Sequence, residues 1–161
     1  MRAYIDIETT GLDPAAAELT VVGIHFEQGG QERMVQLYEC TLTKDNLLAA
    51  LAGTDILYSY NGKEFDLPFI AAKLGVDLAT SFSHCDLMHH CWRRNLYGGL
   101  KKVEAKLGIS RETTGMNGAD AVALWNDYRV NGNSDALRTL LLYNAEDVQN
   151  LAHIRRKLGV D

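Results

Sequence analysis

The order of strand-like and helix-like segments along the chain constrains its fold more than any other feature of the sequence. Short apolar or alternating runs rich in β-favouring residues come first, and helical patterns dominate the last third. The predicted strands cover residues 2–8, 19–26, 33–38, 56–60 and 83–85. The predicted helices cover residues 44–52, 64–74, 100–107, 118–130 and 134–158, and a further helix follows Asp86. Strands interleaved with helices in this way predict an α/β fold with a mixed sheet.

Turn and capping residues separate these segments. The pair Gly29-Gly30 predicts a hairpin between the second and third strands. Thr43 is a suitable N-cap for the first helix, and Gly53 and Gly75 follow the ends of the first two helices. The sequence contains no linker, internal repeat or low-complexity stretch, so we expect residues 1–161 to form a single domain.

Cysteine usage and hydropathy indicate the expected compartment. The three cysteines Cys40, Cys85 and Cys91 form no paired framework, which favours a reduced, cytoplasmic setting. We expect no signal peptide, because the first predicted strand begins at once and carries acidic residues. No apolar run approaches the ~18 residues of a membrane span, so no membrane association is expected.

The net charge of −5 argues at first against a nucleic-acid partner, since proteins that bind phosphate backbones are usually basic. Divalent cations bound by acidic side chains would, however, offset most of this charge. Basic residues also gather at Arg93-Arg94, at Lys101-Lys102 with Lys106, and at Arg155-Arg156-Lys157. Such clusters can hold the end of a single strand, although most surface Lys and Arg side chains are simply solvated.

Asp6 and Glu8 lie two residues apart in the first predicted strand, among the β-favouring residues Tyr4, Ile5 and Ile7. Side chains at this spacing point to the same face of a sheet. Two adjacent carboxylates on a partly buried face repel each other unless a cation lies between them. Hard oxygen ligands suit Mg²⁺ or Mn²⁺. The alternative interpretation is a solvated edge strand with alternating polar residues.

Asp66 follows a short apolar strand and has the apolar neighbours Phe65, Leu67 and Phe69, which can anchor it in the core. This places its carboxylate at the carboxyl end of the sheet, where α/β folds build their sites. The alternative is an aspartate in the first turn of a helix, where the helix dipole favours negative charge.

Tyr143 and Asp147 are four residues apart in the last predicted helix, so they share one face about a turn apart. Leu140, Val148 and Leu151 lie close to that face, which is therefore expected to pack inward. Taken alone, a Tyr–Asp pair at this spacing is more often a local hydrogen bond than a catalytic pair.

Three motifs occur in a fixed order along the chain: Asp-x-Glu at 6–8, Asn-x₃-Phe-Asp at 61–66, and Tyr-x₃-Asp at 143–147. Together they resemble the three exonuclease motifs of the DEDD superfamily, a group of ribonuclease H-like 3′–5′ exonucleases. The Tyr-x₃-Asp form is similar to the tyrosine branch. Residues 84–90, 99–109 and 118–122 further resemble the YprB-like ribonuclease H-like domain subgroup. The resemblance extends from Met1 to about Leu158.

The resemblance implies a ribonuclease H-like fold with a five-stranded mixed sheet, in the spatial order 3-2-1-4-5 and with strand 2 antiparallel. It also implies a 3′–5′ exonuclease that releases nucleoside monophosphates from single-stranded DNA or RNA ends with two divalent cations, Mg²⁺ or Mn²⁺. By analogy, Asp6 bridges the cations, Glu8 and Asp147 complete the site of the cation that activates water, and Asp66 serves the second, partly through water. Tyr143 would orient the attacking water, since its ordinary pKa of ~10 makes it a poor base.

The same analogy places Thr9, the backbone near Gly11, Leu12 and Asn61 around the terminal nucleotide. The basic pairs, rather than the analogy, offer candidates for phosphate contacts: Arg93, Arg94, Lys101 and Lys102. Leu12 would pack on the last base, a contact that does not depend on sequence. No motif distinguishes RNA from DNA, because that choice depends on contacts to the 2′-hydroxyl.

Three alternatives stay open at this point. One is a nucleic-acid or protein-binding module of the same fold without catalysis, and another is an endonuclease of the ribonuclease H type. The third concerns the metal: a cluster of potential zinc ligands comprises His84, Cys85, His89, His90 and Cys91. Structural zinc needs four convergent ligands, usually from two loops, so packing is the favoured role for this cluster.

Overall fold

The computed structural model describes residues Met1 to Asp161. Its five strands are β1 (Arg2–Thr9), β2 (Leu19–Gln28), β3 (Gln31–Tyr38), β4 (Ile56–Ser59) and β5 (Ser83–Asp86). They form one sheet in the order β3-β2-β1-β4-β5. β2 runs antiparallel to β1 and β3, whereas β4 runs parallel to β1 and β5. The expected strand order and the antiparallel second strand are confirmed.

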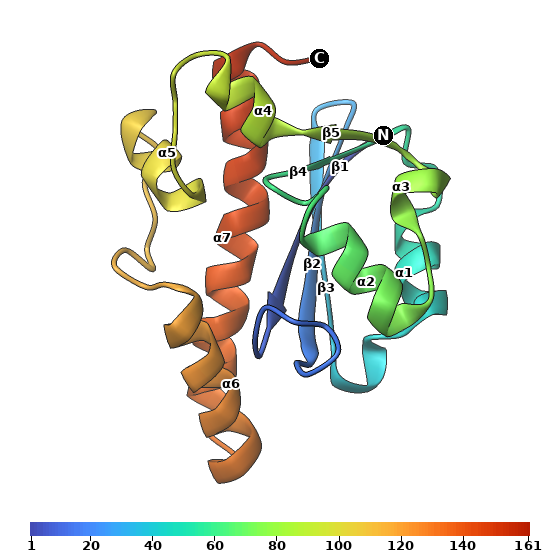
Figure 1. Cartoon of the computed structure of the whole chain (residues 1–161), viewed down its shortest axis with the longest axis vertical. Coiled ribbons are helices and arrows are strands. Elements are labelled where there is room, and N and C mark those ends of the chain that lie inside the picture. The colour runs from blue at the N-terminus through green and yellow to red at the C-terminus, as the bar shows by residue number, and fades with distance from the viewer.

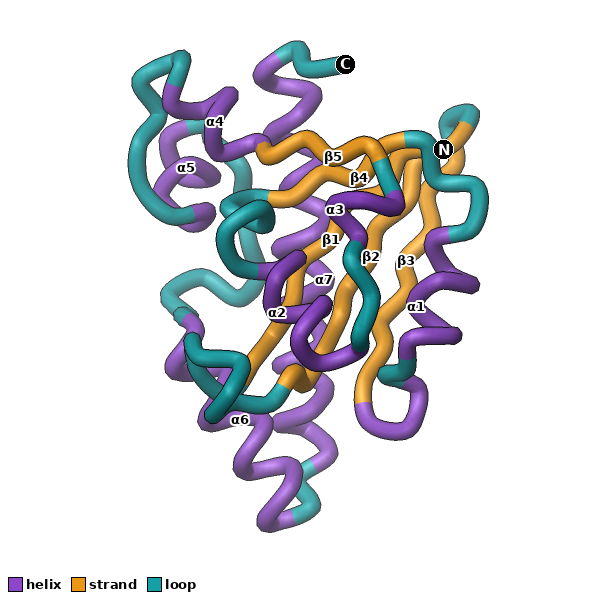
Figure 2. The backbone as a smooth tube through the Cα atoms, turned by 45° about the vertical axis from the view of Figure 1, so that its right-hand side comes forward, coloured by secondary structure: helices purple, strands orange, loops and turns teal.

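Helices cover both faces of the sheet (Figures 1 and 2). One face carries α1 (Lys44–Leu51), α2 (Asp66–Leu74) and α3 (Leu78–Ser81). The other carries α4 (Leu87–Trp92), α5 (Leu100–Lys106), α6 (Gly118–Asn131) and the long α7 (Ser134–Leu158), which crosses β1 and β2. No helix has the length and apolar character needed to cross a membrane.

β1 supplies side chains to both cores of this layered structure. Ala3, Ile5 and Ile7 belong to the apolar cluster under α1 and α2. Tyr4 points to the opposite face and packs with residues of α7, including Leu151. Asp6 and Glu8 share the face of Tyr4 because side chains alternate along a strand. The same alternation that builds two cores therefore directs both carboxylates toward α7.

Local signals set most of the element ends. The Thr43 hydroxyl accepts the N–H of Asn46 and caps α1, and Asp86 caps α4 through the N–H of Met88. Gly29 and Gly30 form the β2–β3 turn with φ values of 58° and 80°, as a tight hairpin requires. Gly75 ends α2 in the left-handed conformation.

Several element ends differ from the sequence-based predictions by one or two residues. The helix expected from residue 64 begins at Asp66, because residues 61–65 form a hydrogen-bonded turn that starts at Asn61 with a φ of 61°. The fifth strand continues to Asp86, one residue further than predicted. Two single-turn helices, Glu39–Thr41 and α3, were not predicted, since helices this short carry no periodic pattern.

Candidate active site

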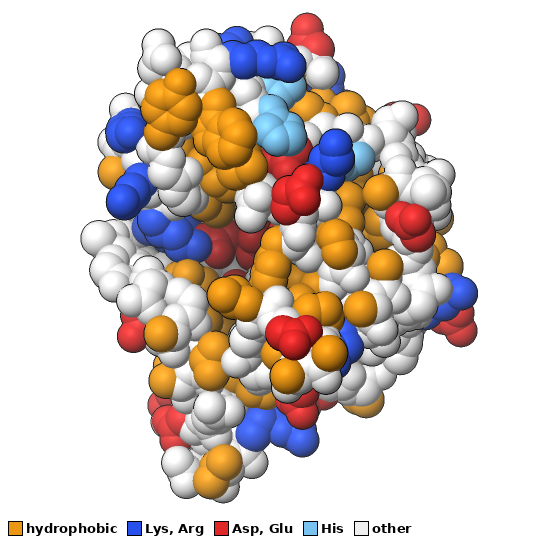
Figure 3. Space-filling view, in the orientation of Figure 1, with side chains coloured by type: hydrophobic (Ala, Val, Ile, Leu, Met, Phe, Trp, Pro, Cys, Tyr) orange, Lys and Arg blue, Asp and Glu red, His pale blue; other side chains and the backbone are white.

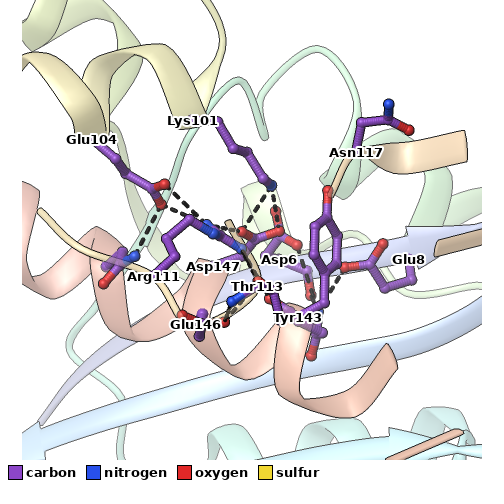
Figure 4. Close-up of polar contacts among 12 residues, drawn as sticks. Asp6, Glu8, Lys101, Glu104, Arg111, Thr113, Asn117, Tyr143, Glu146 and Asp147 are labelled. Carbon is purple, nitrogen blue, oxygen red and sulfur yellow. Dashed lines mark hydrogen bonds and ion pairs between the residues drawn. The ribbon is translucent and has the colours of Figure 1, made fainter. Parts of the chain in front are cut away.

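Three acidic side chains from two distant segments meet where α7 crosses β1 (Figure 4). Asp6 and Glu8 come from β1 and Asp147 comes from α7. One carboxylate oxygen from each lies within 4.8 Å of those of the other two. Glu8 is 7% and Asp147 is 3% exposed, so water solvates these two groups poorly. The structure thus brings together three of the four carboxylates expected at the site.

The close approach of α7 to the sheet depends on a glycine. Gly23 of β2 pairs with Asp6 across the sheet. A Cβ atom at this position would lie 2.1 Å from Oδ1 of Asn144, so only glycine leaves room for that side chain. Asn144 is fully buried, and its Nδ2 donates to the Asp6 carbonyl (3.4 Å) and to Oε1 of Glu8 (3.5 Å). Its Nδ2 also lies 3.5 Å from Oδ2 of Asp6, so Asn144 links α7 to both carboxylates of β1.

Asp66 lies beside this group but outside it. Its side chain is 4% exposed, and its Oδ1 accepts the backbone N–H of Ile7 at 3.1 Å. β4 runs parallel to β1, so the segment that follows β4 returns to the carboxyl end of β1. Asp66 begins α2 on that return. The anchored carboxylate is close enough to Asp6 for its negative charge to raise the pKa of Asp6.

Burial and mutual repulsion disfavour the ionised form of these carboxylates. Burial raises the pKa of Asp6 well above its usual range, and the charges of Asp147, Asp66 and Glu8 raise it further. Burial, with the charge of Asp147, raises the pKa of Glu8 to about 8. Burial also raises the pKa of Asp66 to about 7. A hard divalent cation relieves this repulsion, so the donor set fits Mg²⁺ or Mn²⁺.

Two cationic side chains already contact Asp147. Nζ of Lys101 donates to both carboxylate oxygens at 2.8 Å, and Nη1 of Arg111 lies 2.7 Å from Oδ1. Arg111 also pairs with Glu104 at 2.8 Å, and both of these side chains are buried. Burial disfavours the charged ammonium of Lys101, but the nearby Asp147 and Asp6 carboxylates outweigh this and raise its pKa. Asp147 is thus held by an ammonium and a guanidinium.

Tyr143 packs under these cations. Its side chain is 3% exposed, and its ring lies 4.4 Å from Nζ of Lys101 and 5.3 Å from the guanidinium of Arg111. In Figure 4 the ring stands between Lys101 and Glu8. Burial raises the pKa of Tyr143, so its hydroxyl keeps its proton at neutral pH. The phenol can donate a hydrogen bond but is a poor base.

Glu146 holds the loop that carries Arg111. Its carboxylate accepts the N–H of Glu112 at 2.7 Å, and the N–H and hydroxyl of Thr113 at 3.0 and 2.7 Å. Burial would raise the pKa of Glu146, but these hydrogen bonds, together with the charge of Arg111, lower it overall. Nη2 of Arg111 also donates to the Tyr143 carbonyl at 3.3 Å. The loop and α7 are therefore fastened together beside Asp147.

Three of the four residues expected at the terminal nucleotide, Thr9, Gly11 and Leu12, line a pocket next to Glu8. Its volume is about 370 Å³. The lining residues are Ile7, Glu8, Thr9, Gly11, Leu12, Phe65, Gly118, Ala119 and Val122. Leu12 is 84% exposed, and the Thr9 hydroxyl donates to the Gly11 carbonyl at 2.7 Å. Asn61 is not part of this lining; its N–H donates to Asp86 at 2.8 Å.

The potential zinc ligands do not converge. The structure gathers no three of these side chains within coordination distance. Sγ of Cys85 lies 3.5 Å from Nε2 of His90, and His84 contacts the buried hydroxyl of Ser59 at 2.8 Å. Cys85 lies in β5, whereas His89 lies in α4. These pairs are packing contacts.

Sequence reasoning missed Glu104, Arg111 and Asn144. The burial of Asn144 could have been predicted, because it lies four residues after Leu140 and four before Val148 on the same buried stripe. Glu104 and Arg111 offered no such signal, since charged residues are assigned to the surface unless a partner is known. Their burial depends on a pairing with each other that local sequence does not encode.

A sequence profile of the RNase_H superfamily matches residues 3–159. The chain belongs to the RNase_H superfamily. Among solved structures with the fold of this superfamily, NrnC of Brucella melitensis with bound Mg²⁺ superposes with a TM-score of 0.64 and 22% identity, over 98% of this chain and 71% of that one. NrnC bound to pGG gives a TM-score of 0.66 and 23% identity over the same shares.

The family B DNA polymerase of the hyperthermophilic archaeon Pyrobaculum calidifontis gives a TM-score of 0.71 at 15% identity, over 98% of this RNase_H superfamily chain but 24% of the polymerase. At these identities the likeness is one of fold. No curated protein sequence matches the chain.

Proposed function

We propose that this chain is a 3′–5′ exonuclease that uses two divalent cations to hydrolyse phosphodiester bonds at single-stranded nucleic-acid ends. The observation that carries the proposal is the convergence of the half-buried Asp6 with the buried Glu8 and Asp147, and with the buried Asp66 anchored beside them. Carboxylates crowded in this way are costly to a fold unless they serve a bound cation. The proposal treats residues 1–161 as one ribonuclease H-like domain.

The four carboxylates are the proposed cation ligands, with Asp6 shared between two sites, Glu8 and Asp147 in one and Asp66 in the other. When bound, the cations supply Lewis-acid activation of a water and stabilisation of the leaving 3′-oxygen. Hydrogen bonds to the backbone of β1 hold both Asp66 and Asn144 in place. The carboxylates therefore have fixed positions, and these positions determine where the scissile phosphate lies. The Mg²⁺ seen in NrnC, which shares the fold, supports this assignment.

Tyr143 and Lys101 have separate proposed roles. The Tyr143 hydroxyl, which keeps its proton, orients the attacking water by hydrogen bonding. Lys101 neutralises Asp147 in the structure described here. A divalent cation at Asp147 would repel the ammonium, which would then be free to contact the phosphate of the substrate. Lys101 lies on α5 and Tyr143 lies on α7, and the Lys101 ammonium packs over the Tyr143 ring. One arrangement of these two helices therefore positions both side chains.

The pocket beside Glu8 is the proposed site of the 3′-terminal nucleoside. Leu12 and Phe65 give it apolar walls on which a base can stack without regard to sequence. Its position next to the carboxylates suits cleavage of the last phosphodiester bond, which favours action from the end of a strand. The pGG bound to NrnC supports a short nucleic acid as the ligand of this fold.

A nuclease assay tests the proposal. A 5′-labelled single strand of DNA or RNA is incubated with the protein and Mg²⁺, Mn²⁺ or EDTA, with the Asp6→Asn variant as the matched control. We expect a ladder that shortens one nucleotide at a time with either cation, and no cleavage with EDTA or with the variant.

Two other outcomes would reject the proposal. Internal fragments that appear before any shortened ladder would indicate an endonuclease of the ribonuclease H type. Binding without cleavage under every cation condition would indicate a silent module, in which Lys101 and Arg111 neutralise Asp147 permanently.

A further inference from the structure

The segment between α4 and α5 displays two aromatic rings to solvent. Trp92, the last residue of α4, is 43% exposed, and Tyr97 is 55% exposed. Large aromatic side chains contribute most to a fold when they are buried, so two exposed rings five residues apart need a reason. The only polar contact of the Tyr97 hydroxyl is with Oδ1 of its neighbour Asn95, at 3.3 Å. Neither ring is used by the active site described above.

The backbone that carries these rings is tied down at several points. The Tyr60 hydroxyl donates to the Gly98 carbonyl at 2.6 Å, and Nζ of Lys106 donates to the Tyr97 carbonyl at 2.8 Å. The N–H of Leu96 donates to Cys91 at 3.0 Å. The rings are therefore presented by a fixed loop, which lowers the entropy lost when a ligand binds them.

This loop continues directly into the active site. Tyr60, which holds Gly98, precedes Asn61 at the end of β4. Gly99 caps α5, whose second residue is Lys101, and Lys101 contacts Asp147. In Figure 1 the 92–99 loop runs between α4 and α5 at the upper left, whereas the loop between β1 and β2 lies in the lower half of the view. Glu8 thus joins the carboxylates to the nucleoside pocket, and Asp147 joins them through Lys101 to the helix that follows the aromatic loop.

The charge of this region is opposite to that of the whole chain. From residue 87 to residue 111 there is a single acidic side chain, Glu104, and it is buried against Arg111. The same stretch contains six basic residues, Arg93, Arg94, Lys101, Lys102, Lys106 and Arg111. Figure 3 shows basic and hydrophobic side chains around a hollow that exposes acidic groups. Exposed cations such as Arg93 and Lys102 attract phosphates, which an apolar protein partner does not offer.

We propose that residues 92–99, with the rings of Trp92 and Tyr97, form a stacking platform for nucleotides on the 5′ side of the scissile bond. The inference rests on the proposed function, because it takes a single strand as the substrate. Bases stack on exposed aromatic rings without regard to sequence, while neighbouring Lys and Arg side chains follow the backbone. A dinucleotide fills only the terminal pocket and the carboxylate site. Longer strands reach the platform, so the platform gives the enzyme a preference for them.

The first test measures that preference. The ratio of kcat/KM for a decanucleotide to that for a dinucleotide is compared in wild type, in Trp92→Ala/Tyr97→Ala and in the control Val130→Ala, whose side chain is 81% exposed on α6. Loss of stacking weakens binding by about 10-fold per base, so the ratio should fall at least 10-fold in the double variant. Trp92→Phe/Tyr97→Phe should restore most of it. An unchanged ratio, or equal losses on both substrates, would overturn the platform.

The second test does not depend on cleavage. Trp92 and Trp125 are the two tryptophans, and Trp125 is only 7% exposed. Titration with a decanucleotide in EDTA should quench the fluorescence of wild type and leave that of Trp92→Phe nearly unchanged. Quenching in a protein that cleaves nothing would support the platform while rejecting the proposed exonuclease. Equal quenching in both proteins, or no binding, would reject the platform whether or not the chain is a nuclease.

Discussion

At the scale of single residues, the site is a balance of charges around Asp147. Arg111 neutralises two buried carboxylates at once, those of Asp147 and Glu104. Removing one partner of a buried pair leaves the other charged and unsolvated, which costs far more than breaking an exposed pair. Arg111 therefore acts on stability as well as on the position of Asp147.

We predict that Arg111→Met lowers the free energy of unfolding by about 3 kcal/mol, as measured in urea. The control is Arg138→Met, because Arg138 pairs with Asp135 at 3.0 Å while both side chains are more than three-quarters exposed. Loss of that pair should cost less than about 1 kcal/mol. Similar losses in the two variants would show that burial of Arg111 contributes nothing.

Substitution of Tyr143 can distinguish a catalytic role of its hydroxyl from a structural role of its ring. Tyr143→Phe keeps the ring that packs beneath Lys101 and removes only the hydroxyl. Positioning of water by one hydrogen bond is worth about 2–4 kcal/mol, so single-turnover cleavage should slow by roughly 10²–10³. The melting temperature and its rise with Mn²⁺ should match wild type, because the phenol is not a proposed ligand. A wild-type cleavage rate would make Tyr143 a packing residue.

Glu8 makes stability depend on pH in a way that a cation should reverse. Its pKa is about 8 in the fold against 4.5 ordinarily, so the native state keeps a proton that the unfolded chain releases. The contribution of Glu8 to stability is therefore complete below pH 4.5 and is lost as the pH rises toward 8. Glutamine does not titrate and avoids this loss.

We therefore predict that in EDTA the melting temperature of Glu8→Gln increases relative to that of wild type as the pH rises from 4.5 to 8. Millimolar Mn²⁺ should reverse the order at pH 8, because an ion that binds only the native state raises its stability and wild type offers one more ligand. A difference between the two proteins that is constant with pH, or insensitive to Mn²⁺, would show that Glu8 is not part of a repulsive cation site.

At the scale of elements, the site depends on how closely α7 approaches the sheet. Gly23→Ala places a methyl group where the Asn144 side chain lies, so α7 must shift or Asn144 must leave Asp6 and Glu8. We predict that Gly23→Ala lowers the free energy of unfolding by about 1–3 kcal/mol. The cleavage rate of the protein that remains folded should also fall, because Asp6 and Glu8 lose their contact with Asn144. Val130→Ala in α6 is the control, because that side chain is 81% exposed and lies outside the pocket and the carboxylate site. Equal behaviour of the two variants in melts and assays would contradict this account of the contact.

Local sequence signals predicted most of these elements. Thr43, the Gly29-Gly30 pair and the long apolar stripe of α7 each encode a helix start, a turn or a buried face within a few residues. The helix start at Asp66 was predicted two residues early, because the preceding turn depends on Asp86 accepting the N–H groups of Asn61 and Lys63. Contacts of that kind join segments far apart in the chain, and propensity does not contain them.

In the candidate site, too, local sequence signals were predictive and contacts between distant segments were not. The pairing of Asp6 with Glu8 followed from strand alternation, and that of Tyr143 with Asp147 followed from helix periodicity. Their convergence was expected only through resemblance to a family, and the geometry of three of the four carboxylates agrees with it. The cations on Asp147 and the glycine that admits Asn144 were not foreseen, because each depends on tertiary packing between distant segments.

At the scale of the whole molecule, opposite charges are segregated along one path. Glu8 lines the nucleoside pocket and meets Asp147, and Asp147 in turn contacts Lys101 in the basic segment that contains α5. A strand whose 3′ end enters the pocket would place its last phosphodiester bond at the carboxylates. This arrangement accounts for a net negative chain that is proposed to bind nucleic acid.

The most direct test of that account is a substrate whose only label is the phosphorus of its last phosphodiester bond. A 3′–5′ exonuclease that acts through Asp6, Glu8, Asp66 and Asp147 releases this label first, as a nucleoside monophosphate, with Mn²⁺ present. The same release should be absent with EDTA and in Asp147→Asn. Label that appears first in longer fragments, or release as monophosphate that survives EDTA and Asp147→Asn, would contradict the account.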